Sequence, residues 1–173
     1  MRNEKLQKLT LCGIYLTITE AGLILASFIP GFEMTVLAIT SAVGAFVIIE
    51  AGVKYGIGFY AAALLLGLIL VPNKLGLIPY GLFFGLYPVV KYFAEKNPKT
   101  GIQVTIKLCY FIGVTLAAYY LLFDIFFGNL RLPEWLPTVL VIPAAIGIML
   151  LLDWILTALI NFYFRQIRPK FRR

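Results

Sequence analysis

The feature that most constrains this chain is a series of apolar segments, each long enough to cross a lipid bilayer. A helix spans the bilayer core with about 20 apolar residues, and the sequence holds six such segments. Of its 173 residues, 61% are hydrophobic and only 13% are charged. A soluble domain of this length cannot bury so much apolar surface. The sequence therefore predicts an all-α integral membrane protein, with residues 1–173 forming a single transmembrane domain.

Prolines, glycines and charges mark where the predicted helices end. Pro30 and Gly31 stop the first segment, and the stretch EAGVKYG over residues 50–56 separates the second segment from the third. Residues 33–71 are therefore interpreted as two helices and not as one long helix. The six predicted helices cover residues 6–29, 33–49, 53–71, 75–92, 102–127 and 136–164.

The distribution of lysines and arginines predicts which side of the membrane each loop faces. These residues favour cytoplasmic loops. With the N-terminus inside, all 15 basic residues except Lys74 and Arg131 fall on the inner side. Both termini are therefore predicted to be cytoplasmic. The formal net charge of +7 is then a topology signal and an attraction to anionic lipid headgroups, and it implies no nucleic-acid partner.

The fourth apolar segment holds Pro79 and Pro88, and both predict a kink or break in its helix. Irregular backbone at membrane depth is tolerated only where protein or water covers it. We therefore expect this segment to form a cavity wall, with residues 72–74 as its outer turn. At its inner end Lys91 is expected to reach the lipid headgroups.

Two carboxylates interrupt the apolar segments, Glu20 in the first and Asp153 in the sixth. The helical rise places them at similar depth, where an ionisable group is costly and often functional. One interpretation is a proton relay or a ligand contact. The other is a structural clasp between helices, with one or both carboxyls neutral. Asp153 shares a helix face with Thr157 and Asn161.

A ridge of small residues follows the first predicted helix at a spacing of four, formed by Gly13, Thr17 and Ala21. Small residues in this pattern allow two membrane helices to approach closely. The ridge either packs inside the molecule or forms a docking face for another membrane subunit.

Aromatic and polar residues gather at the predicted outer ends of the helices. Tyr and Trp populate membrane interfaces in any case, but aromatic walls with a few polar groups also form small-molecule pockets. A flat heterocycle fits such walls, and Lys74 or Arg131 suits a carboxylate or phosphate on it. The candidate substrate-binding residues are Glu33, Asn73, Lys74, Tyr80, Tyr119, Tyr120, Trp135 and Asp153.

The common motifs of enzyme chemistry are missing from the sequence, and nothing in it specifies an enzyme. There is no histidine, which removes the commonest general base and transition-metal ligand. There is no G-x-x-x-x-G-K-[ST] motif for ATP hydrolysis, and Cys12 and Cys109 have no metal-ligand spacing. The sequence predicts no catalytic residue, no metal site and no cofactor.

The segment KLTLCGIYLTITEAGLILASFIP over residues 8–30, followed by residues 36–96, resembles the first helices of a known family. That family is the substrate-binding S components of energy-coupling factor (ECF) vitamin transporters, in a clostridial-type subgroup. The resemblance covers residues 6–110 and, more loosely, the rest. In the family the first helix usually carries A-x-x-x-A, where this chain has Gly13, Thr17 and Ala21.

The resemblance implies a subunit of the bacterial plasma membrane that binds a vitamin-like micronutrient and has no ATPase activity of its own. The fourth to sixth helices and the loop over residues 30–33 would form an outward-facing pocket. The first three helices would dock on a transmembrane coupling subunit that two ATPase subunits drive. The resemblance does not indicate which vitamin is bound.

Two other classes of function remain open. One is a stand-alone transporter, coupled to protons through Glu20 and Asp153. The other is a small membrane scaffold such as the cell-shape protein MreD, which has a similar size and helix count, so that fold alone does not separate the two.

Overall fold

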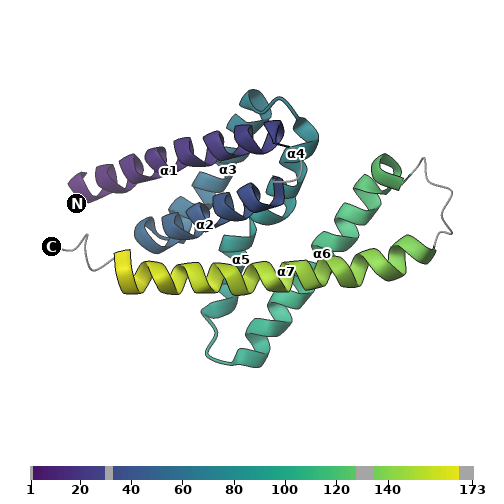
Figure 1. Ribbon diagram of the computed structural model, residues 1–173. Helices are drawn as coiled ribbons and strands as arrows, with labels where there is room; N and C mark the ends of the chain where they lie inside the picture. The colour runs from purple at the N-terminus through teal and green to yellow at the C-terminus, as the bar shows by residue number, and fades with distance from the viewer. Residues whose placement is uncertain (1, 30–32, 128–134, 168–173) are drawn as a thin grey trace. The chain divides into compact units, whose positions relative to one another are not determined.

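The described part of the chain is entirely helical (Figure 1). The computed structural model describes residues 2–29, 33–127 and 135–167, and the side chains of most residues between 119 and 145 lie outside this description. Six of its helices are long and apolar enough to cross a membrane. The prediction of six spans in an all-α chain is confirmed, and the chain is a multi-pass membrane protein by this criterion.

The observed helices begin and end close to the predicted positions. The fourth span consists of three pieces, and the sixth continues into a short π-helix. The elements are α1 (Arg2–Phe28), α2 (Glu33–Ala51), α3 (Val53–Leu70), α4 (Lys74–Pro79), η1 (Tyr80–Phe84), α5 (Tyr87–Glu95), α6 (Thr100–Phe127), α7 (Trp135–Phe162) and η2 (Tyr163–Ile167).

The helices divide into two compact units, Met1–Lys96 and Asn97–Arg173, named the N-terminal unit and the C-terminal unit below. In the N-terminal unit, α2 is the central helix and packs against α1, α3 and α5. It is apolar on all sides, as a buried helix is, and Leu37 and Val47 on it are almost completely buried. The core around α2 is formed by Val43, Val47, Ala51 and Phe59.

Gly52 alone separates α2 from α3. Its φ of 100° lies in the region that glycine adopts without steric cost. Its N–H donates to the Ile48 carbonyl at 3.0 Å, and its own carbonyl accepts from the Gly56 N–H at 3.0 Å. These two bonds continue the helical hydrogen-bond pattern through the turn. The prediction of two helices in place of one is therefore confirmed.

The fourth span is broken where its prolines predicted a break. Pro79 has no N–H to donate, and a π-helix follows it over Tyr80–Phe84. The Gly85 N–H then donates to the Tyr80 carbonyl at 2.7 Å, five residues back. The Tyr60 hydroxyl of α3 donates to the Gly81 carbonyl at 2.7 Å. Protein therefore covers the irregular backbone, as membrane depth requires.

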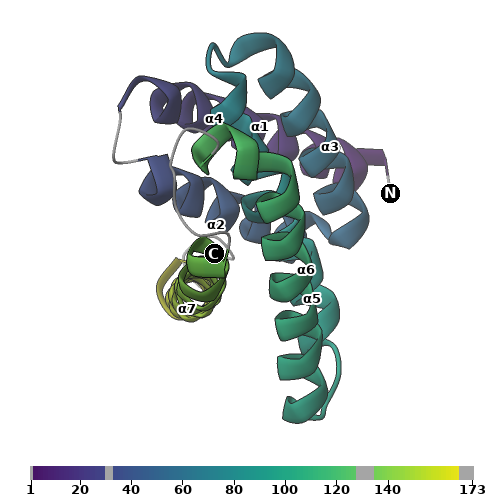
Figure 2. The same cartoon turned by 90° about the vertical axis from the view of Figure 1, so that its right-hand side faces the viewer.

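The C-terminal unit is formed by α6 and α7, which pack against each other. The two helices cross and do not run side by side along their length (Figure 2). At the start of α6, the Gln103 amide nitrogen donates to the Asn97 carbonyl at 2.7 Å. This bond fixes the first turns of the helix against the preceding turn.

Candidate functional site

The most unusual polar group in the N-terminal unit is the side chain of Glu20 on α1. It is 6% exposed. Thr19, beside it on α1, is 0% exposed, and Ser41 on α2 is 1% exposed. The Thr19 and Ser41 hydroxyls and both carboxyl oxygens of Glu20 have no hydrogen-bond partner among the described residues. Buried polar atoms are nearly always hydrogen-bonded, so these four oxygens need a physical explanation.

A small cavity beside Glu20 shows which residues of the neighbouring helices lie at the same depth in the N-terminal unit. Leu23 of α1, Leu37 of α2 and Leu77 of α4 line this cavity together. Residues three or four apart share a helix face. Glu20, Ser41 and Tyr80 are therefore each one turn from these leucines, on the faces that converge. The Glu20 cluster, defined as Thr19, Glu20, Ser41 and Tyr80, is the layer beside the cavity.

Tyr80 connects the Glu20 cluster to the break in the fourth span. Its side chain is 1% exposed, and its ring centroid lies 6.5 Å from that of Tyr60. Leu77, one turn before Tyr80, lines the same small cavity as Leu23, one turn after Glu20, so the two groups lie at the same level. The π-helix that starts at Tyr80 thus lies beside the buried carboxyl, and π-helices are frequent at functional sites.

No cationic side chain among the described residues bonds to Glu20, and the buried Lys91 of the fourth span pairs with Glu95. Over residues 9–32, 34–49, 55–73 and 75–90, Glu20 is the one Asp, Glu, Lys or Arg in the sequence. Lys74, the first residue of α4, is engaged with backbone carbonyls. Its ammonium group donates to the carbonyls of Leu68 and Val71, the latter at 2.7 Å. It thereby caps the C-terminal end of α3.

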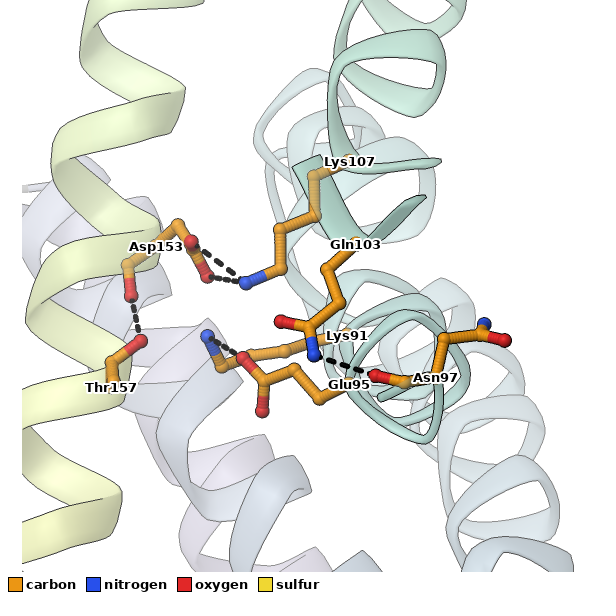
Figure 3. A network of polar contacts seen from close by, with 7 residues as sticks. All are labelled: Lys91, Glu95, Asn97, Gln103, Lys107, Asp153 and Thr157. Carbon is orange, nitrogen blue, oxygen red and sulfur yellow. Dashed lines mark hydrogen bonds and ion pairs between the residues drawn. The ribbon is translucent and has the colours of Figure 1, made fainter. Parts of the chain in front are cut away.

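In the C-terminal unit the carboxylate of Asp153 on α7 is paired with Lys107 of α6 (Figure 3). The Lys107 ammonium lies 3.0 and 3.2 Å from the two Asp153 oxygens, and the two side chains are 12% and 18% exposed. The Thr157 hydroxyl donates to the backbone carbonyl of Asp153 at 2.8 Å. Sequence reasoning missed Lys107 as a partner, although its position inside the predicted helix 102–127 was a signal.

The expectation that Lys91 extends to the lipid headgroups is wrong. Its side chain is buried, and its ammonium lies 2.8 Å from a carboxylate oxygen of Glu95 one turn later on α5 (Figure 3). Glu95 is the more exposed partner. A lysine with an acidic residue at i+4 can pair within its own helix. This ion pair takes the place of the expected contact between Lys91 and the lipid headgroups.

The structure describes four of the predicted substrate-binding residues, Glu33, Asn73, Lys74 and Tyr80, in the N-terminal unit. Glu33 is half-buried and lines the small cavity beside the Glu20 cluster, whose volume of about 10 Å³ holds at most one water molecule. Asn73 is exposed in the turn. Lys74 caps α3, and Tyr80 is buried at the start of η1.

The remaining predicted substrate-binding residues belong to the C-terminal unit. Asp153 is the ion-pair partner of Lys107. The side chains of Tyr119, Tyr120 and Trp135 lie outside the described residues. A pocket formed by the outer ends of the fourth to sixth spans stays a prediction.

The small-residue ridge on α1 lies on an uncovered face. Gly13, Thr17 and Ala21 are all exposed, and a Cβ atom added to Gly13 meets nothing within 4 Å. The Thr17 hydroxyl donates to the Gly13 carbonyl at 3.0 Å, within the same helix. The ridge is therefore not used for packing inside the N-terminal unit.

Among the described residues, no three His, Cys, Asp or Glu side chains are grouped to hold a metal ion. No known family model, curated protein or solved structure matches this chain.

Proposed function

We propose that this chain is the membrane-embedded substrate-binding subunit of an ECF-type importer, an S component in a bacterial plasma membrane with both termini cytoplasmic. The observation that carries the proposal is the uncovered ridge of Gly13, Thr17 and Ala21 on the first of six membrane-length helices. The sequence resemblance assigns the docking of a coupling subunit to this helix.

The chemistry of the ridge supports a protein partner. Helices in lipid gain little from small residues unless another helix approaches them, because association depends on close van der Waals packing. Thr17 keeps its hydroxyl on its own helix by bonding the Gly13 carbonyl, so no unsatisfied polar group opposes docking. A hollow lined by Leu6, Gln7, Thr10, Leu11, Ile14 and Tyr15 extends along the same helix. The occupant that we propose is a helix of a transmembrane coupling subunit, which binds two ATPase subunits.

The cargo in this proposal is a small vitamin-like micronutrient. Its binding residues remain those that the sequence predicts at the outer ends of the fourth to sixth spans. In the N-terminal unit, Asn73 is exposed in the turn between α3 and α4, where it is accessible to a ligand.

The experiment that tests the proposal compares two glycine substitutions in the native cell. Gly13→Leu adds a bulky side chain to the ridge, and Gly113→Leu does the same on α6, where a Cβ atom also meets nothing within 4 Å. Native mass spectrometry of the gently purified wild type should show ATPase-bearing subunits or a bound small molecule. Gly13→Leu should lose the ATPase-bearing subunits, and Gly113→Leu should keep them.

Two results contradict this proposal. Wild-type protein that co-purifies with cell-wall partners and no ATPase favours the MreD-like scaffold. Equal recovery of ATPase subunits with Gly13→Leu removes the ridge as the docking face.

A stand-alone proton-coupled transporter that uses Glu20 and Asp153 is the second candidate, and the burial of Glu20 without a partner favours it. It predicts uptake by the purified chain alone in liposomes under a pH gradient. An S component without its ATPases accumulates no cargo there.

A further inference from the structure

We propose that Glu20 is the charged centre of a binding site for a small monovalent cation, H⁺ or Na⁺, inside the N-terminal unit. The inference rests on the buried oxygens of the Glu20 cluster and does not depend on the S-component assignment.

Leaving the Glu20 carboxylate without a ligand is energetically costly. An ionised carboxylate removed from water is strongly unfavourable unless it is paired or binds a cation. Glu20 is 6% exposed, and neither of its carboxyl oxygens has a protein partner among the described residues. A glutamate that served only as a clasp between helices would accept hydrogen bonds from a neighbouring helix. The geometry lacks those bonds, so the charge has to be balanced by something else.

The atoms of the Glu20 cluster indicate the chemical type of the ligand. All the groups of the cluster present oxygen: the Glu20 carboxyl and the hydroxyls of Thr19, Ser41 and Tyr80. Hard cations prefer oxygen ligands, and a single carboxylate among neutral hydroxyls balances one positive charge. The Thr19 and Ser41 hydroxyls are also buried and unpartnered. A monovalent cation, or a proton on the carboxyl, matches this charge.

Few other titratable groups lie on the helices that face Glu20. Helices α2, α3 and α4 pack against α1. No ionisable side chain lies on α2 between Glu33 and Glu50. α3 carries Lys54, Tyr55 and Tyr60. Tyr55 lies beside Lys8 near the start of α1, and Tyr60 packs against Tyr80 of η1. Lys74 on α4 is held by carbonyls at the end of α3. A response to cations from this region is therefore assigned to Glu20.

The test is thermal unfolding of the full chain in lipid nanodiscs. In the first arm NaCl replaces choline chloride at constant ionic strength and pH. In the second arm the pH is varied without Na⁺. A ligand that binds only the folded state raises the Tm as its concentration increases. Bound Na⁺ should raise the Tm in the first arm. A bound proton should make the Tm fall as the pH rises, because the folded state then holds one proton more than the unfolded state.

Three variants make the test specific. Glu20→Gln keeps the shape of the side chain and should abolish whichever dependence the wild type shows. Glu4→Gln, on the exposed first turn of the same helix, should leave that dependence unchanged. Ser41→Ala should weaken the response to Na⁺ at least tenfold in apparent affinity if Na⁺ is the ligand, and should leave a proton response in place.

An infrared measurement supports the test in case Glu20→Gln does not fold. A proton on Glu20 gives a carbonyl-stretch band of a neutral carboxyl in the wild type near neutral pH, and bound Na⁺ gives a carboxylate band that shifts when the ion is removed. The proposal is overturned if the wild-type Tm responds to neither ion and the infrared spectrum shows neither the neutral-carboxyl band nor a carboxylate band that shifts on removal of Na⁺.

Discussion

The two units treat a carboxylate inside a membrane helix in opposite ways. In the C-terminal unit, Asp153 faces the ammonium of Lys107 at 3.0 Å, and both side chains keep some exposure. In the N-terminal unit, Glu20 is almost completely buried and has no partner among the described residues. A charge in hydrocarbon has to be neutralised, and for Asp153 the cation is Lys107 of the chain itself.

The difference indicates which of the two carboxylates is available for a ligand. A paired aspartate already has its counter-charge, so its contribution is to hold α6 against α7. An unpaired glutamate accepts an exchangeable counter-charge. The sequence presents both residues as equivalent interruptions of apolar segments, and only the structure distinguishes them.

The largest expected effect comes from breaking the paired carboxylate. Asp153→Asn removes the carboxylate that pairs with Lys107. It should reduce the free energy of unfolding by about 3 kcal/mol, the smallest loss usual for breaking a buried pair, because both side chains are partly exposed. Glu20→Gln removes no partner and should cost far less near neutral pH. Reversible unfolding in mixed micelles measures both values.

The double variant Lys107→Met with Asp153→Leu is the control for this prediction. Replacing both members of a buried pair with apolar residues is often neutral, so most of the lost stability should return. If Glu20→Gln is as destabilising as Asp153→Asn, the contrast between the two units is wrong.

A smaller effect is expected from adding one methyl group where α1 and α2 meet. A Cβ atom on Gly22 would lie 2.7 Å from the Cγ2 atom of the buried Thr40. Gly22→Ala should therefore destabilise the N-terminal unit by about 2 kcal/mol, as overpacking does. Gly113→Ala in the C-terminal unit meets nothing within 4 Å and should stabilise α6 by up to about 1 kcal/mol. Equal effects of the two substitutions on unfolding would show that the α1–α2 contact is looser than described.

A third prediction concerns the hydrogen bond at the π-helix. Tyr60→Phe removes the donor to the Gly81 carbonyl and should cost about 1 kcal/mol, the usual net value of one such bond. Tyr92→Phe, at an exposed tyrosine of α5, should leave the free energy of unfolding unchanged. Hydrogen exchange at the amides of residues 80–85 should rise in the first variant and stay constant in the second. Unchanged exchange in Tyr60→Phe would remove the bond as a support of the π-helix.

The last prediction changes no stability and tests orientation. In a chain with Cys12 and Cys109 replaced by serine, Asn73→Cys and Lys99→Cys place single thiols in exposed turns at the end of α3 and before α6. A membrane-impermeant maleimide added to intact cells should label Asn73→Cys and leave Lys99→Cys unlabelled until the cells are opened. The reverse pattern would invert the predicted topology.

The spans were predictable from sequence because membrane helices are defined by length and hydropathy, which each segment carries on its own. The break after Pro79 was predictable for the same reason, since the missing N–H is a property of one residue. Partnerships were harder to predict. The pairing of Lys107 with Asp153 depends on how α6 and α7 cross, which neither helix fixes alone. The pairing of Lys91 with Glu95 depends on competition with the lipid headgroups for the lysine.

The candidate site shows the same limit. Tyr80 was predicted as a substrate-binding residue, and its burial beside Tyr60 in the N-terminal unit could not be read from the sequence. The π-helix adds a residue to its turn, and this shift in register is not encoded by hydropathy. The burial of Glu20 without a partner also required the packing of three helices to be known.

The single-residue turn at Gly52 has a consequence for how the protein enters the membrane. With one residue between α2 and α3, the last turn of one helix and the first turn of the next stay at the same depth. A connection of one residue is too short for one helix to stay at the membrane interface while the other inserts. The two are therefore expected to partition from the translocation machinery into lipid together, as one helical hairpin. A bulkier residue at a position with a φ of 100° should then impair insertion before it affects the finished fold.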